Sequence, residues 1–218
     1  MRVVIAGGHG KIALILEKLL AERGDSAVGL IRNPAQAGDL EAVGAEAVVV
    51  DLENASVDEV AAHLRGADAV VFAAGAGPGS GVDRKTTVDR DAAILLADAA
   101  EAAGVGRYLM VSAMGADEPA AGDDPVFTAY LAAKAAADDA VRGRSALNTT
   151  IVRPGGLTDD AATDRVRVAE STGRGTIPRA DVAAMLVALL DAPATGGVTF
   201  ELVSGDASIG EAVALLTP

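Results

Sequence analysis

Ser112, Tyr130 and Lys134 are the residues whose types and spacing best fit proton transfer. Tyr130 and Lys134 are four positions apart, so on a helix they lie on the same face. A phenol has an ordinary pKa of about 10, and a nearby ammonium lowers that pKa because it favours the phenolate. We therefore expect Tyr130 to exchange a proton with a substrate oxygen while Ser112 orients the reacting carbonyl group. The same spacing also occurs by chance on solvated helix faces.

A glycine turn at the N-terminus indicates a second candidate site. The apolar run at 3–6 predicts a strand, the apolar spacing from 12 onward predicts a helix, and glycines separate the two. Gly7 permits a tight turn, and Gly10 lets the backbone N–H groups of the helix approach a ligand. Because such a helix end suits a pyrophosphate, the pattern favours a dinucleotide site over a purely structural turn. The contacts expected from this turn are those of Gly7, Gly8, His9, Gly10, Lys11 and Ile12.

Arg32 follows the second predicted strand and bears on the choice of dinucleotide. An acidic residue at this place would bind the ribose 2′-hydroxyl of NAD, whereas an arginine suits the 2′-phosphate of NADP through a bidentate, charge-assisted contact. We therefore expect the cofactor to be NADP, bound as NADPH. The alternative is an ordinary surface arginine in a turn.

Residues after the third and fourth predicted strands complete the expected cofactor site. Asp51 could accept a hydrogen bond from the adenine amino group while Leu52 flanks the ring, or Asp51 could simply close a loop. After the fourth strand, small residues let the chain pass close beneath the cofactor. These are Ala74, Gly75 and Ala76. The next stretch, 78–85, is expected to be a loop over the cleft or an ordinary surface loop.

The composition excludes several classes of function. A formal net charge of −13 argues against a nucleic-acid or anionic-membrane partner, because both need a cationic face. No cysteine and only two histidines, without ligand spacing, argue against a disulfide, thiol catalysis or a metal site. No apolar run approaches the roughly 18 residues of a membrane span, and the N-terminus does not resemble a signal peptide. We expect a cytoplasmic protein with a small-molecule substrate.

Alternating strand and helix patterns predict one α/β domain over residues 1–218. Strands are expected at 3–6, 26–31, 45–50, 69–74, 107–112, 148–153 and 198–203, and helices at 11–23, 35–43, 58–65, 88–103, 127–143, 180–190 and 210–216. The resulting fold class is a Rossmann fold, a doubly wound, mostly parallel sheet of about seven strands with helices on both faces. The chain is expected to be a monomer or a homodimer: helices 88–103 and 127–143 could form a dimer face or be buried within the chain.

Together these motifs resemble the short-chain dehydrogenase/reductase superfamily. The resemblance covers essentially the whole chain and is strongest to the atypical branch of small NAD(P)H-binding proteins, with its NmrA-like and biliverdin reductase B-like groups. It rests on the glycine turn with Ala13 in place of a final glycine, Arg32-Asn33-Pro34, the segment 88–93, Ser112, Tyr130, Lys134 and the segment 153–157.

The resemblance implies further site residues. Lys134 would also bind the nicotinamide ribose, and Asp89 joins the catalytic set at a position where the wider superfamily has an asparagine. That change would alter the proton relay assumed for the wider superfamily. The expected contacts near the nicotinamide are Pro154, Gly155, Gly156 and Leu157. The region around 155–178 is too short for the substrate domain of extended relatives, so a small or open substrate pocket is expected.

The function that these residues favour is that of an NADP-dependent oxidoreductase. It would transfer hydride to a small carbonyl or quinone-like substrate, with Tyr130 as the proton donor. One alternative is a non-catalytic, NADP(H)-sensing regulator in the NmrA-like manner, and a weaker one is a sugar epimerase or dehydratase. The trio of Ser112, Tyr130 and Lys134 favours the enzyme, because a sensor does not need it.

Overall fold

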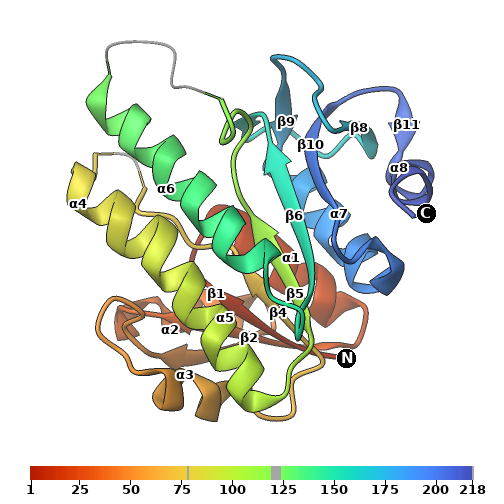
Figure 1. Cartoon of the computed structure of the whole chain (residues 1–218). Helices are drawn as coiled ribbons and strands as arrows, with labels where there is room; N and C mark the ends of the chain where they lie inside the picture. The colour runs from red at the N-terminus through yellow and green to blue at the C-terminus, as the bar shows by residue number, and fades with distance from the viewer. Residues whose placement is uncertain (78, 119–123, 218) are drawn as a thin grey trace.

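The computed structural model describes residues 1–77, 79–118 and 124–217, and within them a nine-stranded sheet has helices on both faces (Figure 1). The strands are β1 (Arg2–Ala6), β2 (Ser26–Ile31), β3 (Glu46–Val49), β4 (Ala69–Phe72), β5 (Arg107–Val111), β6 (Asn148–Pro154), β7 (Gly156–Thr158), β8 (Arg165–Ala169), β9 (Thr176–Pro178), β10 (Thr199–Ser204) and β11 (Ala207–Ser208). The helices are α1 (Lys11–Glu22), α2 (Ala37–Ala42), α3 (Val57–Leu64), α4 (Val82–Arg84), α5 (Ala92–Ala103), α6 (Pro125–Arg142), α7 (Arg179–Leu190) and α8 (Ile209–Leu215), with 3-10 turns η1 (Pro34–Gln36) and η3 (Pro193–Thr195) and a π-helix η2 (Lys85–Asp91). The predicted α/β fold is confirmed. Among the described helices, none combines the length and the apolar character needed to cross a membrane.

The main sheet has the strand order β11-β8-β10-β6-β5-β4-β1-β2-β3. The seven strands from β10 to β3 pair in parallel and correspond to the seven predicted strands. β8 pairs antiparallel with both β10 and β11, so two strands that were not predicted extend one edge of the sheet. A second, two-stranded parallel sheet joins β7 and β9. The region around 155–178 thus contains three short strands.

β1 lies where the strand order reverses, because it pairs with β2 on one side and with β4 on the other. Val4, for example, is in register with Val28 and with Val70. Residues 3–6 are completely buried, as expected for a central strand covered on both faces. In sheets of this type, ligands bind beyond the carboxyl ends of the strands beside the reversal. The turns that follow β1, β2, β3 and β4 therefore border one crevice.

Helices on the two faces of the sheet bury two apolar layers. α1 and α7 pack against each other on one face, with Leu16 and Leu186 in the layer between helices and sheet. α3, α5 and α6 cover the opposite face, where Leu64, Leu96 and Val141 are buried (Figure 1). The apolar positions of α5 thus face the interior of the chain, and this burial accounts for them without a dimer face.

α6 begins two residues earlier than predicted because the side chain of Asp124 caps it. The carboxylate of Asp124 accepts hydrogen bonds from the backbone N–H groups of Val126 and Phe127, at 2.9 and 3.2 Å. Pro125, which cannot donate a backbone hydrogen bond, occupies the first helical position.

The predicted loop at 78–85 is wrong in its second half. Val82–Arg84 is helical, and Lys85 opens the π-helix that continues into α5. Pro78, the first residue of the predicted loop, lies outside the described part of the chain. The π-helix matters for the site, because π-helical segments are frequent at functional sites.

Candidate cofactor and active site

The glycine turn after β1 leaves the N-terminus of α1 open to a ligand. Gly7 has a φ of +81°, and an added Cβ would lie 2.6 Å from the Cα of Ala74, so glycine is required there. Gly10 precedes α1, and no side chain caps the helix. The first N–H groups of α1, at the positive end of its dipole, thus remain available to an anion. This cradle fits the pyrophosphate of a dinucleotide.

Three residues predicted to contact the cofactor from this turn do not line the cavity beside it. Gly8 backs onto β2, where an added Cβ would lie 2.6 Å from the Cα of Gly29. Ile12 is buried in the core, and the exposed Lys11 pairs through Nζ with Asp159 at 2.5 Å. Gly8 is therefore required for close packing on β2, which the sequence did not indicate. Cofactor contacts by these three residues stay predictions.

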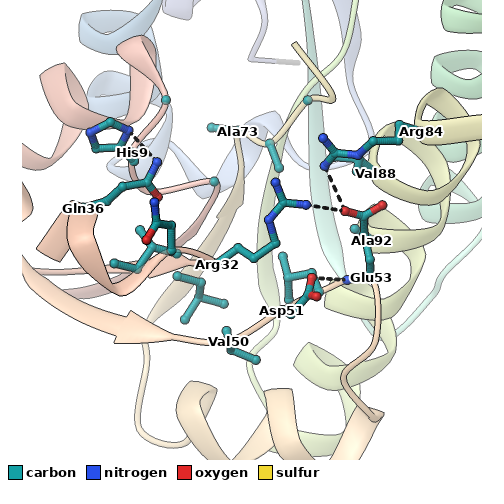
Figure 2. A pocket seen from close by; sticks show the side chains of 18 residues that line it. His9, Arg32, Gln36, Val50, Asp51, Glu53, Ala73, Arg84, Val88 and Ala92 are labelled. Carbon is teal, nitrogen blue, oxygen red and sulfur yellow. Dashed lines mark hydrogen bonds and ion pairs between the residues drawn. The ribbon is translucent and has the colours of Figure 1, made fainter. Parts of the chain in front are cut away.

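A cavity of about 360 Å³ lies at the carboxyl ends of β1, β2, β3 and β4 (Figure 2). We call it the adenosine cavity because its wall contains most of the residues predicted to hold that half of the cofactor. They are Gly7, His9, Gly10, Arg32, Asp51, Leu52, Ala74 and Gly75. Ala76 does not line this cavity, and its N–H donates instead to the carboxylate of Asp89 at 3.3 Å.

Arg32 lines the adenosine cavity, but a carboxylate that the sequence did not single out engages it. Nη1 of Arg32 donates to Oε2 of Glu53 at 2.8 Å. Glu53 stands two positions after Asp51, so an acidic side chain following the third strand was the signal that could have identified it. To bind a 2′-phosphate through this nitrogen, Arg32 would have to give up its ion pair with Glu53.

Asp51 closes the turn that follows β3. Its carboxylate accepts hydrogen bonds from the backbone N–H of Glu53 at 3.1 Å and from the side-chain amide of Asn54 at 2.8 Å. These contacts agree with the simpler of its two predicted roles, that of a loop residue. A hydrogen bond from Asp51 to adenine stays a prediction.

His9 connects the glycine turn to the segment after β2. Its Nε2 lies 2.7 Å from the carboxylate of Asp39, and its Nδ1 lies 3.0 Å from the side-chain amide of Gln36. Gln36 also lines the adenosine cavity, and Figure 2 shows the two side chains together at one end of it. The sequence did not indicate Gln36 or Asp39.

A second cavity, of about 750 Å³, lies beyond the carboxyl ends of β5 and β6. Ser112, directly after β5, and Tyr130, on α6, both line it, so the fold brings two predicted catalytic residues to one cavity. The predicted nicotinamide contacts line it as well: Pro154, Gly155, Gly156 and Leu157. The Ser112 hydroxyl oxygen is buried and has no hydrogen-bond partner among the described residues.

Lys134 and Asp89 lie beside Tyr130 but are buried beneath the cavity. Nζ of Lys134 is 3.4 Å from Oδ1 of Asp89 and donates to the backbone carbonyl of Val111 at 3.2 Å. The same Nζ is 5.9 Å from the ring centroid of Tyr130. The structure thus brings Tyr130, Lys134 and Asp89 together, and their catalytic use stays a prediction.

The predicted lowering of the Tyr130 pKa is wrong. Burial raises the pKa of the Tyr130 hydroxyl, and the negative charges of Asp89 and Asp138 raise it further. Burial also lowers the pKa of Lys134, an effect that the negative charge of Asp89 opposes. Tyr130 is therefore a protonated phenol at neutral pH, and a weaker acid than an ordinary tyrosine.

Lys85 is a further charged residue at this site that the sequence did not indicate. Its side chain is buried, and its Nζ donates to the backbone carbonyl of Gly77 at 3.0 Å. The same Nζ lies 5.4 Å from the ring centroid of Tyr130. A loop was expected there, and the π-helix turns this lysine inward.

Comparisons with known proteins give consistent matches over nearly the whole chain. A family model described as NAD(P)H-binding matches residues 7–193. YhfK of Bacillus subtilis (strain 168), named an uncharacterized sugar epimerase, is 38% identical over 214 residues, 98% of this chain and 99% of that protein. A Bacillus halodurans structure named a putative NAD-dependent epimerase/dehydratase is 38% identical with a TM-score of 0.91, covering 99% of both chains. The oxidoreductase ylbE from Lactococcus lactis is 25% identical with a TM-score of 0.87, covering 99% of this chain and 96% of that one.

Proposed function

Because the chain belongs to the NAD(P)H-binding family, we propose that it is an NADP-dependent oxidoreductase of the short-chain dehydrogenase/reductase type, acting on a small carbonyl or quinone-like substrate. The observation that carries this proposal is the arrangement of Ser112 and Tyr130 around one cavity of about 750 Å³. The Ser112 hydroxyl lies buried at the wall of this cavity beside the carboxylate of Asp138, and we assign it the role of orienting the substrate oxygen.

Different residues at the carboxyl ends of the strands would bind different parts of the cofactor. The open N-terminus of α1 would bind the pyrophosphate, and Arg32 at the adenosine cavity would bind the 2′-phosphate. Lys134 would bind the nicotinamide ribose, and the segment 154–157 would border the nicotinamide. When bound, NADPH supplies the hydride that reduces the substrate carbon.

Tyr130 would supply the proton in this reaction. Its hydroxyl is protonated at neutral pH, so it can donate to the oxygen of a carbonyl group as hydride reaches the carbon, because the alkoxide that forms there is a stronger base than a phenolate. The Ser112 hydroxyl would donate a hydrogen bond to the same oxygen and hold the carbonyl in place.

Two other functions use the same cofactor site. The names of the two relatives at 38% identity favour a sugar epimerase or dehydratase, in which the nicotinamide is reduced and reoxidised within one turnover. A sensor that binds NADP(H) without turnover is the other alternative. Both differ from a reductase in consuming no NADPH.

The test is NADPH oxidation by the full chain with a panel of small aldehydes, ketones, quinones and flavins. Tyr130→Phe removes the proposed proton donor, and Tyr108→Phe is the matched control, because the chain has only these two tyrosines. Tyr108 is buried away from the cavity and donates to the backbone carbonyl of Ala93. We expect turnover that falls by about 10²-fold or more in Tyr130→Phe and is retained in Tyr108→Phe.

The other outcomes discriminate among the three functions. Turnover that is unaffected by Tyr130→Phe would keep the oxidoreductase but remove Tyr130 from its mechanism. Sugar-nucleotide conversion without net NADPH consumption would establish the epimerase. Tight NADPH binding with neither activity would favour the sensor.

A further inference from the structure

Arg32 and Arg84 approach one carboxylate oxygen from two different elements at the wall of the adenosine cavity. Nη1 of Arg32, which follows β2, and Nη2 of Arg84, the last residue of α4, each lie 2.8 Å from Oε2 of Glu53. The other oxygen of Glu53 accepts a hydrogen bond from the Thr87 hydroxyl at 2.6 Å. Figure 2 shows both guanidinium groups directed at the same carboxylate oxygen of Glu53.

Two guanidinium groups face one carboxylate, and the hydrogen bond from Thr87 and the two arginines hold the pKa of Glu53 below its usual range, so Glu53 is ionised. With Asp51, which lines the same cavity, the wall carries two arginines and two carboxylates. A phosphate would therefore bind by replacing Glu53 between the two guanidinium groups, and not because the wall has a net positive charge.

The two arginines are accessible and have donors to spare. Their side chains are 55% and 40% exposed, and one guanidinium nitrogen of each is directed at Glu53. A guanidinium has five N–H donors in a planar fork, which matches the oxygens of a phosphate group. Two such forks on one cavity wall suit a phosphomonoester better than a neutral hydroxyl.

We propose that Arg84 is a second ligand for the 2′-phosphate of the cofactor, and that Glu53 holds both arginines until that phosphate displaces it. The proposal rests on the proposed use of NADP. Glu53 is thus a built-in competitor for the phosphate, and Arg84 is a specificity residue in addition to Arg32. Since NADH has no 2′-phosphate, it binds without disturbing the cluster.

Removing Arg84 or the charge of Glu53 should change the affinity for NADPH more than the affinity for NADH. Without Arg84 the phosphate loses one of its two cations, so NADPH should bind less tightly. Without the charge of Glu53 the phosphate no longer competes with that carboxylate for the two arginines, so NADPH should bind more tightly. The affinity for NADH should change little in both variants.

The experiment is calorimetric titration of the full chain with NADPH, NADH, adenosine 2′-monophosphate and adenosine 5′-monophosphate. The variants are Arg84→Met, Glu53→Gln and Arg32→Met. Arg90→Met is the matched control, because Arg90 is partly exposed, as Arg84 is, and pairs only with Asp91 among the described residues. We expect Arg84→Met to raise the Kd for NADPH about tenfold and Glu53→Gln to lower it about threefold or more. The Kd for NADH should stay within about twofold, and Arg90→Met should change neither.

Across the variants, the Kd for adenosine 2′-monophosphate should change as the Kd for NADPH does. The Kd for adenosine 5′-monophosphate should change as the Kd for NADH does. If Arg84→Met leaves NADPH binding unchanged while Arg32→Met weakens it, the use of NADP stands and the role of Arg84 is refuted. If Glu53→Gln weakens NADH binding and not NADPH binding, Glu53 is a ligand of the ribose hydroxyl and the competitor role is refuted. A wild-type chain that binds neither dinucleotide would overturn the proposed function together with this inference.

Discussion

The Nζ of Lys134 lies 3.4 Å from the Oδ1 of Asp89, and both side chains are buried. The carboxylate of Asp89 therefore offsets the positive charge of Lys134 at close range, so that charge does not favour a phenolate on Tyr130. Burial and the negative charges nearby raise the pKa of Tyr130 instead. Asp89 thus adds to the effect of burial on the pKa of the proposed proton donor.

Asp89→Asn should let Tyr130 ionise at a lower pH. The substitution removes a negative charge that raises the Tyr130 pKa and keeps the size of the side chain. Phenolate absorbance, followed against pH, reports this directly, because the only other tyrosine, Tyr108, is completely buried and its pKa is also raised. The double variant with Tyr130→Phe assigns the transition, and Asp91→Asn on the exposed side of the same segment is the control. An unchanged titration in Asp89→Asn would refute the control of Tyr130 by Asp89.

Arg153→Met should destabilise the fold by about 3–5 kcal/mol. Arg153 is buried and donates from Nε to the carboxylate of Asp138 at 2.8 Å, while its other nitrogens bind Asp117. Asp138 is completely buried, and burial raises its pKa, so loss of Arg153 leaves a buried acid without its cation. Chemical denaturation at neutral pH measures the cost.

Two further variants test why Arg153→Met lowers the free energy of unfolding. Arg142→Met removes an exposed arginine that pairs with Asp139 at 2.8 Å, and it should cost less than about 1 kcal/mol. Adding Asp138→Asn to Arg153→Met should recover part of the lost stability, because the acid that needs the cation is gone. A double variant as unstable as Arg153→Met would show that packing by Arg153, rather than its charge, is what the fold requires.

The sequence predicts the parallel part of the fold well because buried strands there are continuous apolar runs. Residues 3–6 and 69–72 are completely or almost completely buried, and their apolar character alone identifies them as strands. The resemblance to small NAD(P)H-binding proteins is confirmed by the family to which the chain belongs. β7 and β9 have only three residues each, too few for a periodic pattern. β8, Arg165–Ala169, does alternate in sequence and could have been identified from Val166 and Val168.

The site was less predictable than the fold, because its charges interact across the chain. Glycine spacing identified the turn at Gly7, since a positive φ leaves a local signature in the sequence. The pairing of Arg32 with Glu53 joins residues that follow different strands, and only the parallel packing of β2 and β3 brings them together. The inward direction of the Lys85 side chain likewise depends on a π-helix, which the apolar pattern of the sequence does not predict.

Glu17 makes the stability of the fold depend on pH. It lies on α1 beneath the glycine turn, completely buried, and neither carboxylate oxygen has a hydrogen-bond partner among the described residues. Burial raises the pKa of Glu17 from 4.5 to about 8. Between these two values the folded chain holds a proton that the unfolded chain releases, so the free energy of unfolding falls as the pH rises. Above the folded pKa both states are ionised and the dependence ends.

Glu17→Gln should remove this dependence, because the amide has nearly the same shape and does not titrate. The difference in free energy of unfolding between the variant and the wild type should increase with pH by up to about 1.4 kcal/mol per pH unit between about pH 5 and 8. Denaturant unfolding at a series of pH values measures this, with Glu22→Gln as the control, since Glu22 is exposed on the same helix. Parallel curves for Glu17→Gln and wild type would show that the carboxyl group finds water or a partner in the folded chain.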